Sequence, residues 1–179
     1  MNLPNIITLA RILLVPFIIW LMISSQFAAA FGTFLIAGLS DAADGYIAKH
    51  WDAVTELGAH LDPLADKALL VSIYLTLGLL QHLPAWLVLM VATRDVLIIG
   101  AVLLARVLEQ PVTVAPLMIS KVNTTGQILL AGAVLAGLAF GFHGHWLLDL
   151  GQYIVGALTI ASGAAYLKCW IDHMTQATP

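Results

Sequence analysis

Four aspartates lie at spacings that could bring their carboxylates together in an otherwise apolar chain. Asp41 and Asp44 are three residues apart, and a second pair follows. In that pair, Asp62 and Asp66 are four residues apart. On a helix, side chains three or four residues apart lie on one face, so each pair would present two carboxylates in the same direction. Carboxylates held close together repel one another unless cations neutralise them. The pattern therefore predicts a cation site.

The oxygen-only character of this set indicates the kind of cation. Carboxylate oxygens suit hard ions such as Mg²⁺ or Mn²⁺ rather than Zn²⁺. Four carboxylates can hold two such ions, and a pair of ions can polarise a diphosphate for displacement. The alternative is that the aspartates are interfacial loop charges paired with Lys49 and Lys67. We favour the metal site, because acids placed within membrane segments are costly and usually functional.

The elements that must position these acids are transmembrane helices. Hydrophobic residues make up 61% of the 179 residues and charged residues only 9%, whereas a soluble domain carries roughly 25% charged residues. One span needs ~20 apolar residues, which leaves room for about six spans and short loops. We predict an all-α integral membrane protein, a six-transmembrane-helix bundle that forms a single domain over residues 1–179. The predicted spans cover residues 6–25, 28–49, 60–81, 84–107, 118–141 and 147–170.

Turn-forming and polar residues separate these spans, because Pro and Gly end helices. The breaks fall at residues 24–26, 50–58, 81–84, 109–111 and 141–144. The short connection between the second and third spans predicts antiparallel neighbours, which would let the two aspartate pairs converge near one membrane surface. Pro63 would lie in the first turn of the third span, where proline is tolerated.

The basic residues indicate the orientation, because Lys and Arg are enriched in cytoplasmic loops. The loops after the first, third and fifth spans carry none of the seven Lys and Arg residues, and Arg94 alone falls in mid-span. This predicts that both termini and the aspartates are cytoplasmic, whereas His82, His143 and His145 lie in loops on the other side. The first residues lack the pattern of a signal peptide, so we expect no cleaved leader.

The acidic segment resembles the signature of the CDP-alcohol phosphotransferases. Lys49 stands where that family usually has Arg; Lys keeps the charge but loses bidentate geometry, so we expect altered phosphate contact rather than lost activity. The resemblance implies a six-helix membrane bundle with this signature on its second and third helices. The positions that carry it are Asp41, Asp44, Gly45, Ala48, Lys49, Gly58, Asp62 and Asp66.

The resemblance also implies a role for each of these residues. The four aspartates would bind two divalent ions, Mg²⁺ or Mn²⁺, that hold the diphosphate of a CDP-linked lipid. Asp66 would be the general base for the acceptor hydroxyl, whose oxygen attacks the lipid-side phosphorus as CMP leaves. Gly45 would let the nucleotide approach the backbone, and Ala48 and Gly58 would let the helices close. The residues assigned to CDP in the segment are Asp44, Gly45, Ala48, Lys49 and Gly58.

The N-terminal residues resemble the opening of one branch of this family, which contains the phosphatidylglycerophosphate synthases and the cardiolipin synthases. Asn5, Thr8 and Arg11 follow one another at intervals of three residues, along one stripe of a helix. In this interpretation Asn5 and Thr8 approach the nucleotide or its phosphates. The alternative is a helix cap, with Arg11 as an interfacial anchor.

Arg94 and Lys121 are the predicted acceptor contacts. An Arg at mid-membrane depth must face a polar cavity or a partner, so we predict that both cations neutralise the acceptor's phosphate. The alternative is that Arg94 pairs with Asp95 or another acid for structure. The sequence around both cations resembles the cardiolipin synthases of mitochondria and some bacteria, whereas the other synthases usually have a second Arg where this chain has Val102. This favours phosphatidylglycerol as acceptor, with glycerol 3-phosphate as the alternative.

A carboxylate-lined ion transporter is the main competing class, since intramembrane acids also mark ion paths. Transport would predict an internal repeat and acids at the bilayer midplane, whereas these acids cluster towards one face. The net charge of −3 is against a nucleic-acid partner, and the lone Cys169 excludes an intramolecular disulfide. We expect an enzyme of the bacterial inner membrane that uses CDP-diacylglycerol and a glycerol-containing acceptor at its cytoplasmic face. The resemblance implies a homodimer.

Overall fold

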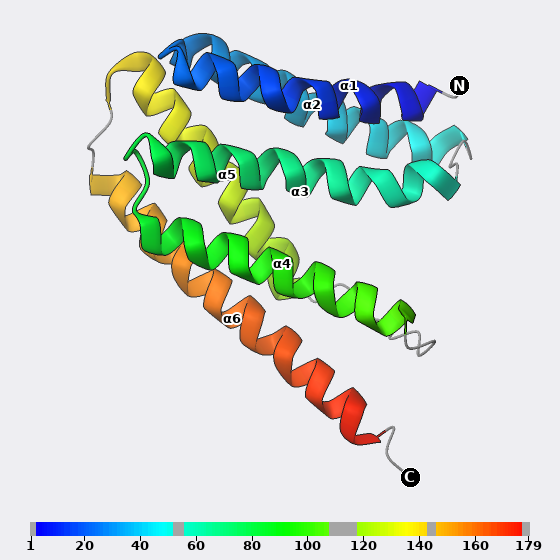
Figure 1. The fold of residues 1–179 in the computed structure, drawn as a ribbon. Helices are drawn as coiled ribbons and strands as arrows, with labels where there is room; N and C mark the ends of the chain where they lie inside the picture. Colours follow the sequence, from blue (N-terminus) through cyan, green and yellow to red (C-terminus); the bar gives the residue numbers. More distant parts are fainter. Residues whose placement is uncertain (1–2, 52–55, 108–117, 143–145, 177–179) are drawn as a thin grey trace. The chain divides into compact units, whose positions relative to one another are not determined.

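The computed structural model describes residues 3–51, 56–107, 118–142 and 146–176. Side chains are described for residues 12–40, 67–100, 118–142 and 146–169. The described part of the chain forms six α-helices and no strand (Figure 1), so the predicted all-helical class is confirmed. The helices are α1 (Leu3–Ile23), α2 (Phe27–Trp51), α3 (Glu56–Leu79), α4 (Ala85–Val107), α5 (Met118–Phe140) and α6 (Trp146–Gln176).

Three helix ends differ from the predicted spans by three residues or more. α1 begins at Leu3, so Asn5 lies inside its first turn rather than ahead of it, which disfavours Asn5 as the cap. α3 begins at Glu56 rather than at residue 60, so Pro63 lies about two turns into the helix and the first-turn prediction is wrong. α6 continues to Gln176, beyond the predicted end at residue 170. The cause is common to α3 and α6: hydrophobicity marks a membrane span, whereas a helix can continue through polar residues beyond it.

Two helices, α1 and α3, each end in a backbone turn of the same type. Ser25 after α1 and Gln81 after α3 have positive φ angles of 57° and 62°. In both turns the N–H of the next residue donates to the carbonyl five positions earlier, at 2.8 Å. This is the Schellman arrangement, which satisfies carbonyls that a helix end leaves unpaired. Gly141 after α5 has a φ of 80°. The predicted breaks at these three places are confirmed.

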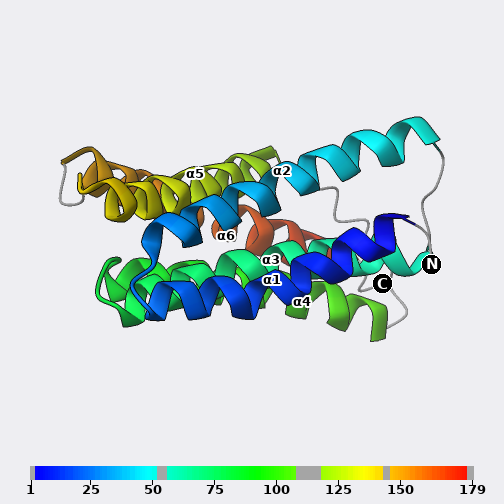
Figure 2. The ribbon, with the colours of Figure 1, turned by 90° about the horizontal axis from the view of Figure 1, so that it is seen from above.

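The first compact unit, Met1–Leu83 with Ala131–His145, is organised around α1. α1 packs against both α2 and α3 (Figures 1 and 2). The second half of α5 belongs to this unit, and the rings of Phe31 and Phe140 meet edge to face with centroids 5.9 Å apart. Buried apolar residues recur at helical spacing, so they form one interior stripe on each helix. They include Ile18, Met22, Ile73, Leu77 and Leu135.

The second compact unit, Pro84–Leu130 with Trp146–Pro179, contains α4, the first half of α5 and α6. α4 packs against α6 (Figure 1). A Cβ added at Gly156 of α6 would lie only 2.7 Å from Cζ3 of Trp86 on α4. The Trp86 ring also stacks on Tyr153, with centroids 5.7 Å apart. The ring therefore lies directly against the α6 backbone.

Replacing Gly156 with Ala is expected to destabilise this contact. The new methyl group cannot share space with the Trp86 ring, and moving the ring would break its stacking on Tyr153. Overpacking of this kind costs about 1–3 kcal/mol. Gly163 is the matched control on the same helix, because its added Cβ would lie 4.0 Å from Cγ of Arg94, an ordinary contact. In detergent, Gly156→Ala should lower the Tm, and Gly163→Ala should leave it unchanged or raise it. Equal Tm values for the two variants would contradict this packing.

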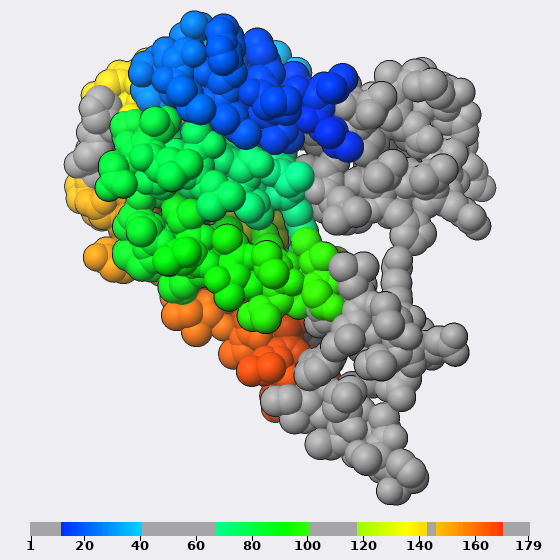
Figure 3. Space-filling model, viewed as in Figure 1, coloured from blue at the N-terminus to red at the C-terminus, as the bar shows by residue number. Residues whose placement is uncertain are grey.

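Apolar surface is extensive in the described part of the chain. Within it, two helical stretches are long and apolar enough to cross a membrane, Met118–Phe140 and Trp146–Cys169. Shorter apolar stretches cover Ile12–Ile23, Phe27–Ser40 and Lys67–Leu79. α1, in blue, forms part of the face in Figure 3. Its exposed large apolar side chains are Ile12, Leu13, Phe17, Trp20 and Ile23. Soluble proteins rarely expose such patches, so this surface suits contact with lipid.

Candidate active site

The two aspartate pairs lie on two helices of the first compact unit. Asp41 and Asp44 fall within α2, and the second pair within α3. The predicted spacings are therefore helical at both places, including the interval from Asp62 to Asp66. The C-terminal end of α2 and the N-terminal end of α3 lie at the same end of this unit (Figures 1 and 2). The four side chains lie outside the described residues, so the convergence of their carboxylates stays a prediction.

The other residues assigned to CDP lie on α2 and α3 and on α1, which packs against both. α1 contacts both α2 and α3, and its N-terminal end lies at the end of the unit where the aspartate segments are found (Figure 1). Their side chains also lie outside the described residues, and their contacts stay predictions. On α1 they are Asn5 and Thr8, on α2 Gly45, Ala48 and Lys49, and on α3 Gly58.

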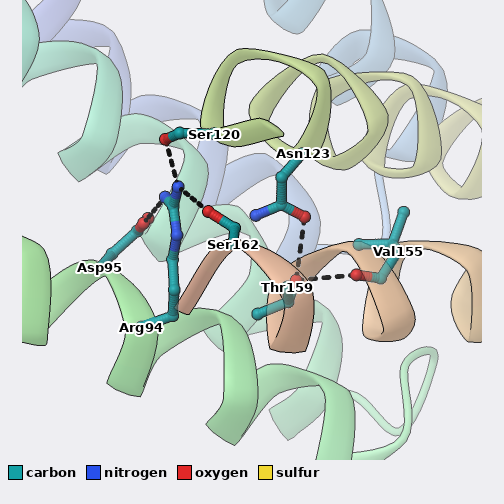
Figure 4. A network of polar contacts seen from close by, with 7 residues as sticks. All are labelled: Arg94, Asp95, Ser120, Asn123, Val155, Thr159 and Ser162. Atoms are coloured by element: carbon teal, nitrogen blue, oxygen red, sulfur yellow. Dashed lines mark hydrogen bonds and ion pairs between the residues drawn. The ribbon is translucent and has the colours of Figure 1, made fainter. Parts of the chain in front are cut away.

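Arg94 lies in a buried polar cluster of the second compact unit (Figure 4). Its Nη1 donates to Oδ1 of Asp95 at 2.5 Å. Its Nη2 donates to the hydroxyl of Ser120 and, at 2.8 Å, to that of Ser162. The ring centroid of Tyr166 lies 5.8 Å from the guanidinium carbon. A single side chain of α4 thus joins α5 through Ser120 and α6 through Ser162.

The structure contains the ion pair between Arg94 and Asp95 that the structural alternative describes, and it leaves the acceptor role of Arg94 untested. Both side chains are only 4% exposed, and a charge so far from water requires a compensating partner. The Arg94 Nε is buried and has no hydrogen-bond partner among the described residues. An unpaired buried donor costs about 1–3 kcal/mol. Contact between Arg94 and an acceptor stays a prediction, and Nε is the donor with which that contact could be made.

Lys121 is the second predicted acceptor contact. It follows Ser120 on α5, and its side chain is exposed. An exposed ammonium is a mobile point charge that can follow an anion, whereas the buried Arg94 guanidinium is fixed by its partners. The two predicted cations therefore differ in kind. The role of Lys121 stays a prediction.

Sequence reasoning missed the polar contribution of α6. Ser162 is fully buried and Thr159 is 3% exposed. The Thr159 hydroxyl lies 3.0 Å from Oδ1 of Asn123 on α5 and 2.8 Å from the Val155 carbonyl, so its proton can be donated to either. Figure 4 shows this contact beside the Arg94 cluster. The signal was present: Thr159, Ser162 and Tyr166 are three and four residues apart on an apolar helix, which places them on one face.

A family model described as CDP-alcohol phosphatidyltransferase matches residues 1–165, including the four aspartates and both predicted acceptor cations. The chain belongs to this family. Membership in the CDP-alcohol phosphatidyltransferases confirms the resemblance of the acidic signature. It is also evidence against the alternative that the chain is an ion transporter. The family is membrane-bound, in agreement with the two apolar helices long enough to span a bilayer.

Relatives within the family represent two related reactions. The cardiolipin synthase (CMP-forming) of Rattus norvegicus is 36% identical over 181 residues, which cover 92% of this chain and 60% of the rat protein. The CDP-diacylglycerol–glycerol-3-phosphate 3-phosphatidyltransferase of Bacillus subtilis (strain 168) is 33% identical over 187 residues, which cover 94% of this chain and 95% of that protein. The enzyme of the same name from Pseudomonas fluorescens is 34% identical over 190 residues. This chain thus spans about 60% of the length of the rat relative.

The residues of the signature fit the divalent ions that this family uses. All four donors are carboxylates, which Mg²⁺ and Mn²⁺ accept readily. Two helices of one unit supply them, from helix ends that lie at the same end of that unit (Figure 1). Among the described side chains, no group of three or more His, Cys, Asp or Glu residues could hold a metal ion. The described part of the chain therefore offers no competing metal site.

Proposed function

We propose that this chain is an integral membrane enzyme that transfers a phosphatidyl group from CDP-diacylglycerol to the hydroxyl of a glycerol-type acceptor and releases CMP. The observation that carries this proposal is the family match over residues 1–165, with the acidic signature on α2 and α3. The chemistry of four carboxylates at helical spacing supports it independently, because a diphosphate needs its charge neutralised before it can be displaced.

The four aspartates provide the chemistry at the diphosphate. Asp41, Asp44, Asp62 and Asp66 would hold two Mg²⁺ or Mn²⁺ ions, which when bound neutralise the phosphate oxygens. Asp66 also accepts the proton of the acceptor hydroxyl, since a hydroxyl is a poor nucleophile near pH 7 without a base. The hydroxyl oxygen bonds to the lipid-side phosphorus. The bond from that phosphorus to the bridging oxygen breaks, and CMP keeps that oxygen and its electron pair.

The nucleotide side of the site is assigned to small and polar residues near the aspartates. Gly45 lets the nucleotide approach the α2 backbone, and Ala48 and Gly58 let the helices close around it. Lys49 contacts a phosphate as a point charge rather than through two parallel hydrogen bonds. On α1, Asn5 and Thr8 reach the nucleotide or its phosphates. Asp44 contributes to both the ions and CDP.

The membrane arrangement completes the proposal. All six helices span the bilayer, both termini are cytoplasmic, and the aspartates face the cytoplasm from a bacterial inner membrane. The distribution of Lys and Arg supports this orientation. Thiol labelling with an impermeant reagent, at a cysteine placed in the turn after α1 and at one placed near the end of α6, would test it in intact cells and inverted vesicles. We also propose a homodimer.

Phosphatidylglycerol is the proposed acceptor, which makes the product cardiolipin. Val102 stands where the family's glycerol 3-phosphate enzymes usually have a second Arg, and a phosphodiester needs fewer cations than a phosphomonoester. Glycerol 3-phosphate is the second candidate. The Bacillus subtilis relative supports it, because that match covers 95% of a protein named for this acceptor.

The purified protein in detergent should release CMP from CDP-diacylglycerol only when an acceptor and a divalent ion are both present. Phosphatidylglycerol, glycerol 3-phosphate and inositol phosphate would be offered separately, each with Mg²⁺, with Mn²⁺ and with a chelator, and the lipid product identified. We expect cardiolipin from phosphatidylglycerol and no turnover with the chelator. No CMP release with any acceptor would overturn the proposed enzyme. Phosphatidylglycerophosphate as the only product would instead identify glycerol 3-phosphate as the acceptor.

A further inference from the structure

The buried polar residues of the second compact unit form two layers, one helical turn apart (Figure 4). In the outer layer, Arg94 Nη2 donates to the hydroxyls of Ser120 on α5 and Ser162 on α6. In the inner layer, the Thr159 hydroxyl of α6 lies 3.0 Å from Oδ1 of Asn123 on α5. Asn123 follows Ser120 by three residues, and Thr159 precedes Ser162 by three. Residues three apart are neighbours on a helix, so the two layers are adjacent.

The outer layer meets the surface of the molecule, and the inner layer does not. Ser120 is partly exposed, and the neighbouring Lys121 is exposed. Asn123, by contrast, is fully buried. A molecule that entered beside Ser120 would therefore meet Arg94 first and Asn123 one turn further in.

Each layer contains a buried hydrogen-bond donor that has no partner among the described residues. These donors are Nε of Arg94 and Nδ2 of Asn123. The amide oxygen of Asn123 faces the Thr159 hydroxyl, and the amide nitrogen points towards the Arg94 side of the cluster in Figure 4. Buried donors are normally paired, because an unpaired one destabilises the fold. Two such donors in adjacent layers indicate a ligand that supplies oxygen atoms.

The chemistry of the two donors suits a phosphate oxygen. Neither donor can accept a hydrogen bond from a ligand, and hydrogen bonds to an ionised oxygen are the strong ones. We infer that Asn123 binds the acceptor: its Nδ2 donates to an oxygen of the acceptor's phosphate, beside the oxygen that Arg94 Nε binds. This rests on the proposed function, in which Arg94 contacts that phosphate. Thr159 is a positioning residue, because its hydroxyl holds the amide oxygen and so directs the nitrogen towards the ligand.

The first test compares the kinetics of the wild type with those of Asn123→Ala, which lacks the donor. Losing one hydrogen bond to a charged oxygen weakens binding by about tenfold to a hundredfold. We expect the KM for phosphatidylglycerol to rise by about that factor, while kcat and the KM for CDP-diacylglycerol stay near their wild-type values. Thr125→Val is the control on the same helix, because the Thr125 hydroxyl is exposed and bonds to the Lys121 carbonyl of α5 itself. It should leave all three values unchanged.

Asn123→Asp separates acceptor binding from a purely structural role. The carboxylate has the shape of the amide and can still accept the hydrogen bond from Thr159, but it replaces the donor with an oxygen that repels a phosphate. The KM for phosphatidylglycerol should therefore rise at least as far as in Asn123→Ala. If Asn123 only held its neighbours in place, Asp would hold them too. A wild-type KM in this variant would overturn the inference.

Ligand-induced stabilisation provides a measurement without turnover. Phosphatidylethanol offers a phosphodiester without the reactive glycerol, and diacylglycerol offers no phosphate. In detergent with a chelator, phosphatidylethanol should raise the wild-type Tm above the Tm with diacylglycerol, because a ligand of the folded state stabilises it. This difference should be smaller in Asn123→Ala, each protein being compared with its own Tm.

No difference in the wild type, or an equal difference in both proteins, would overturn the inference, while continued CMP release would still uphold the proposed function. Absence of CMP release with every acceptor would instead remove the proposed function, and with it the acceptor from this site.

Discussion

Asp66→Asn should reduce CMP release by between about a hundredfold and ten-thousandfold, the range that a positioned general base contributes. Asn has nearly the same shape as Asp, but its amide cannot take the proton of the acceptor hydroxyl. It also removes one negative charge from the set that would hold the divalent ions. The measurement is single-turnover CMP release from CDP-diacylglycerol in detergent, at saturating acceptor and saturating Mg²⁺ or Mn²⁺, so that weaker ion binding does not mask the loss of the base.

Asp149→Asn is the matched control for this variant. Asp149 is an exposed acid in the first turn of α6, so the same chemical change there should leave turnover at the wild-type level. Both variants should elute from size-exclusion chromatography as folded protein in detergent. Wild-type turnover by a folded Asp66→Asn variant would contradict the role of Asp66 as base.

Arg94→Met should destabilise the second compact unit by about 3 kcal/mol or more, because it leaves Asp95 buried without its counter-charge. The substitution also removes the hydrogen bonds that join α4 to Ser120 on α5 and Ser162 on α6. Met occupies similar space, so the loss would come from electrostatics and hydrogen bonding rather than from a cavity. The measurement is the folded fraction that remains as the protein is heated in detergent.

Lys121→Met separates this structural effect from the loss of a cation in general. Lys121 is exposed, and substitutions at exposed positions usually change stability by less than ~0.5 kcal/mol. Its Tm should therefore match that of the wild type, whereas the efficiency with an anionic acceptor should fall in both variants. If the two variants unfold at the same temperature, the buried ion pair does not stabilise the unit in the way inferred from its geometry.

The helices could be predicted from the sequence because their apolar residues give a strong signal. Long apolar runs interrupted at Ser25, Gln81 and Gly141 mark the turns, and these positions are where the backbone adopts positive φ. The error at Pro63 has a physical cause. Hydrophobicity reports where a segment enters the bilayer, but backbone hydrogen bonding continues wherever nothing stops it, and α3 continues through Glu56 at its polar end.

The site could be predicted only where chemistry constrains spacing within one helix. The interval from Asp62 to Asp66 is such a constraint, and the helix observed there agrees with it. The partners of Arg94 are different, because Ser120 and Ser162 come from two other helices. Their meeting depends on how helices pack, which no local pattern encodes. Ser162 in particular is a small residue in an apolar helix, and sequence alone does not distinguish a hydrogen-bond acceptor from a packing residue there.

The neighbouring positions of Arg94 and Asp95 also bear on how the protein reaches the bilayer. If α4 spans the membrane as proposed, each charge alone would oppose insertion by roughly 2.5–3.5 kcal/mol at the helix centre. Because the counter-ion is the next residue of the same helix, α4 can partition into lipid as a neutral segment before the ribosome has finished α5 and α6. The serines of those later helices then complete the coordination of a guanidinium that is already compensated. A carboxylate on α6 could make the same folded contact, but it would arrive only after α4 had crossed with an unbalanced charge.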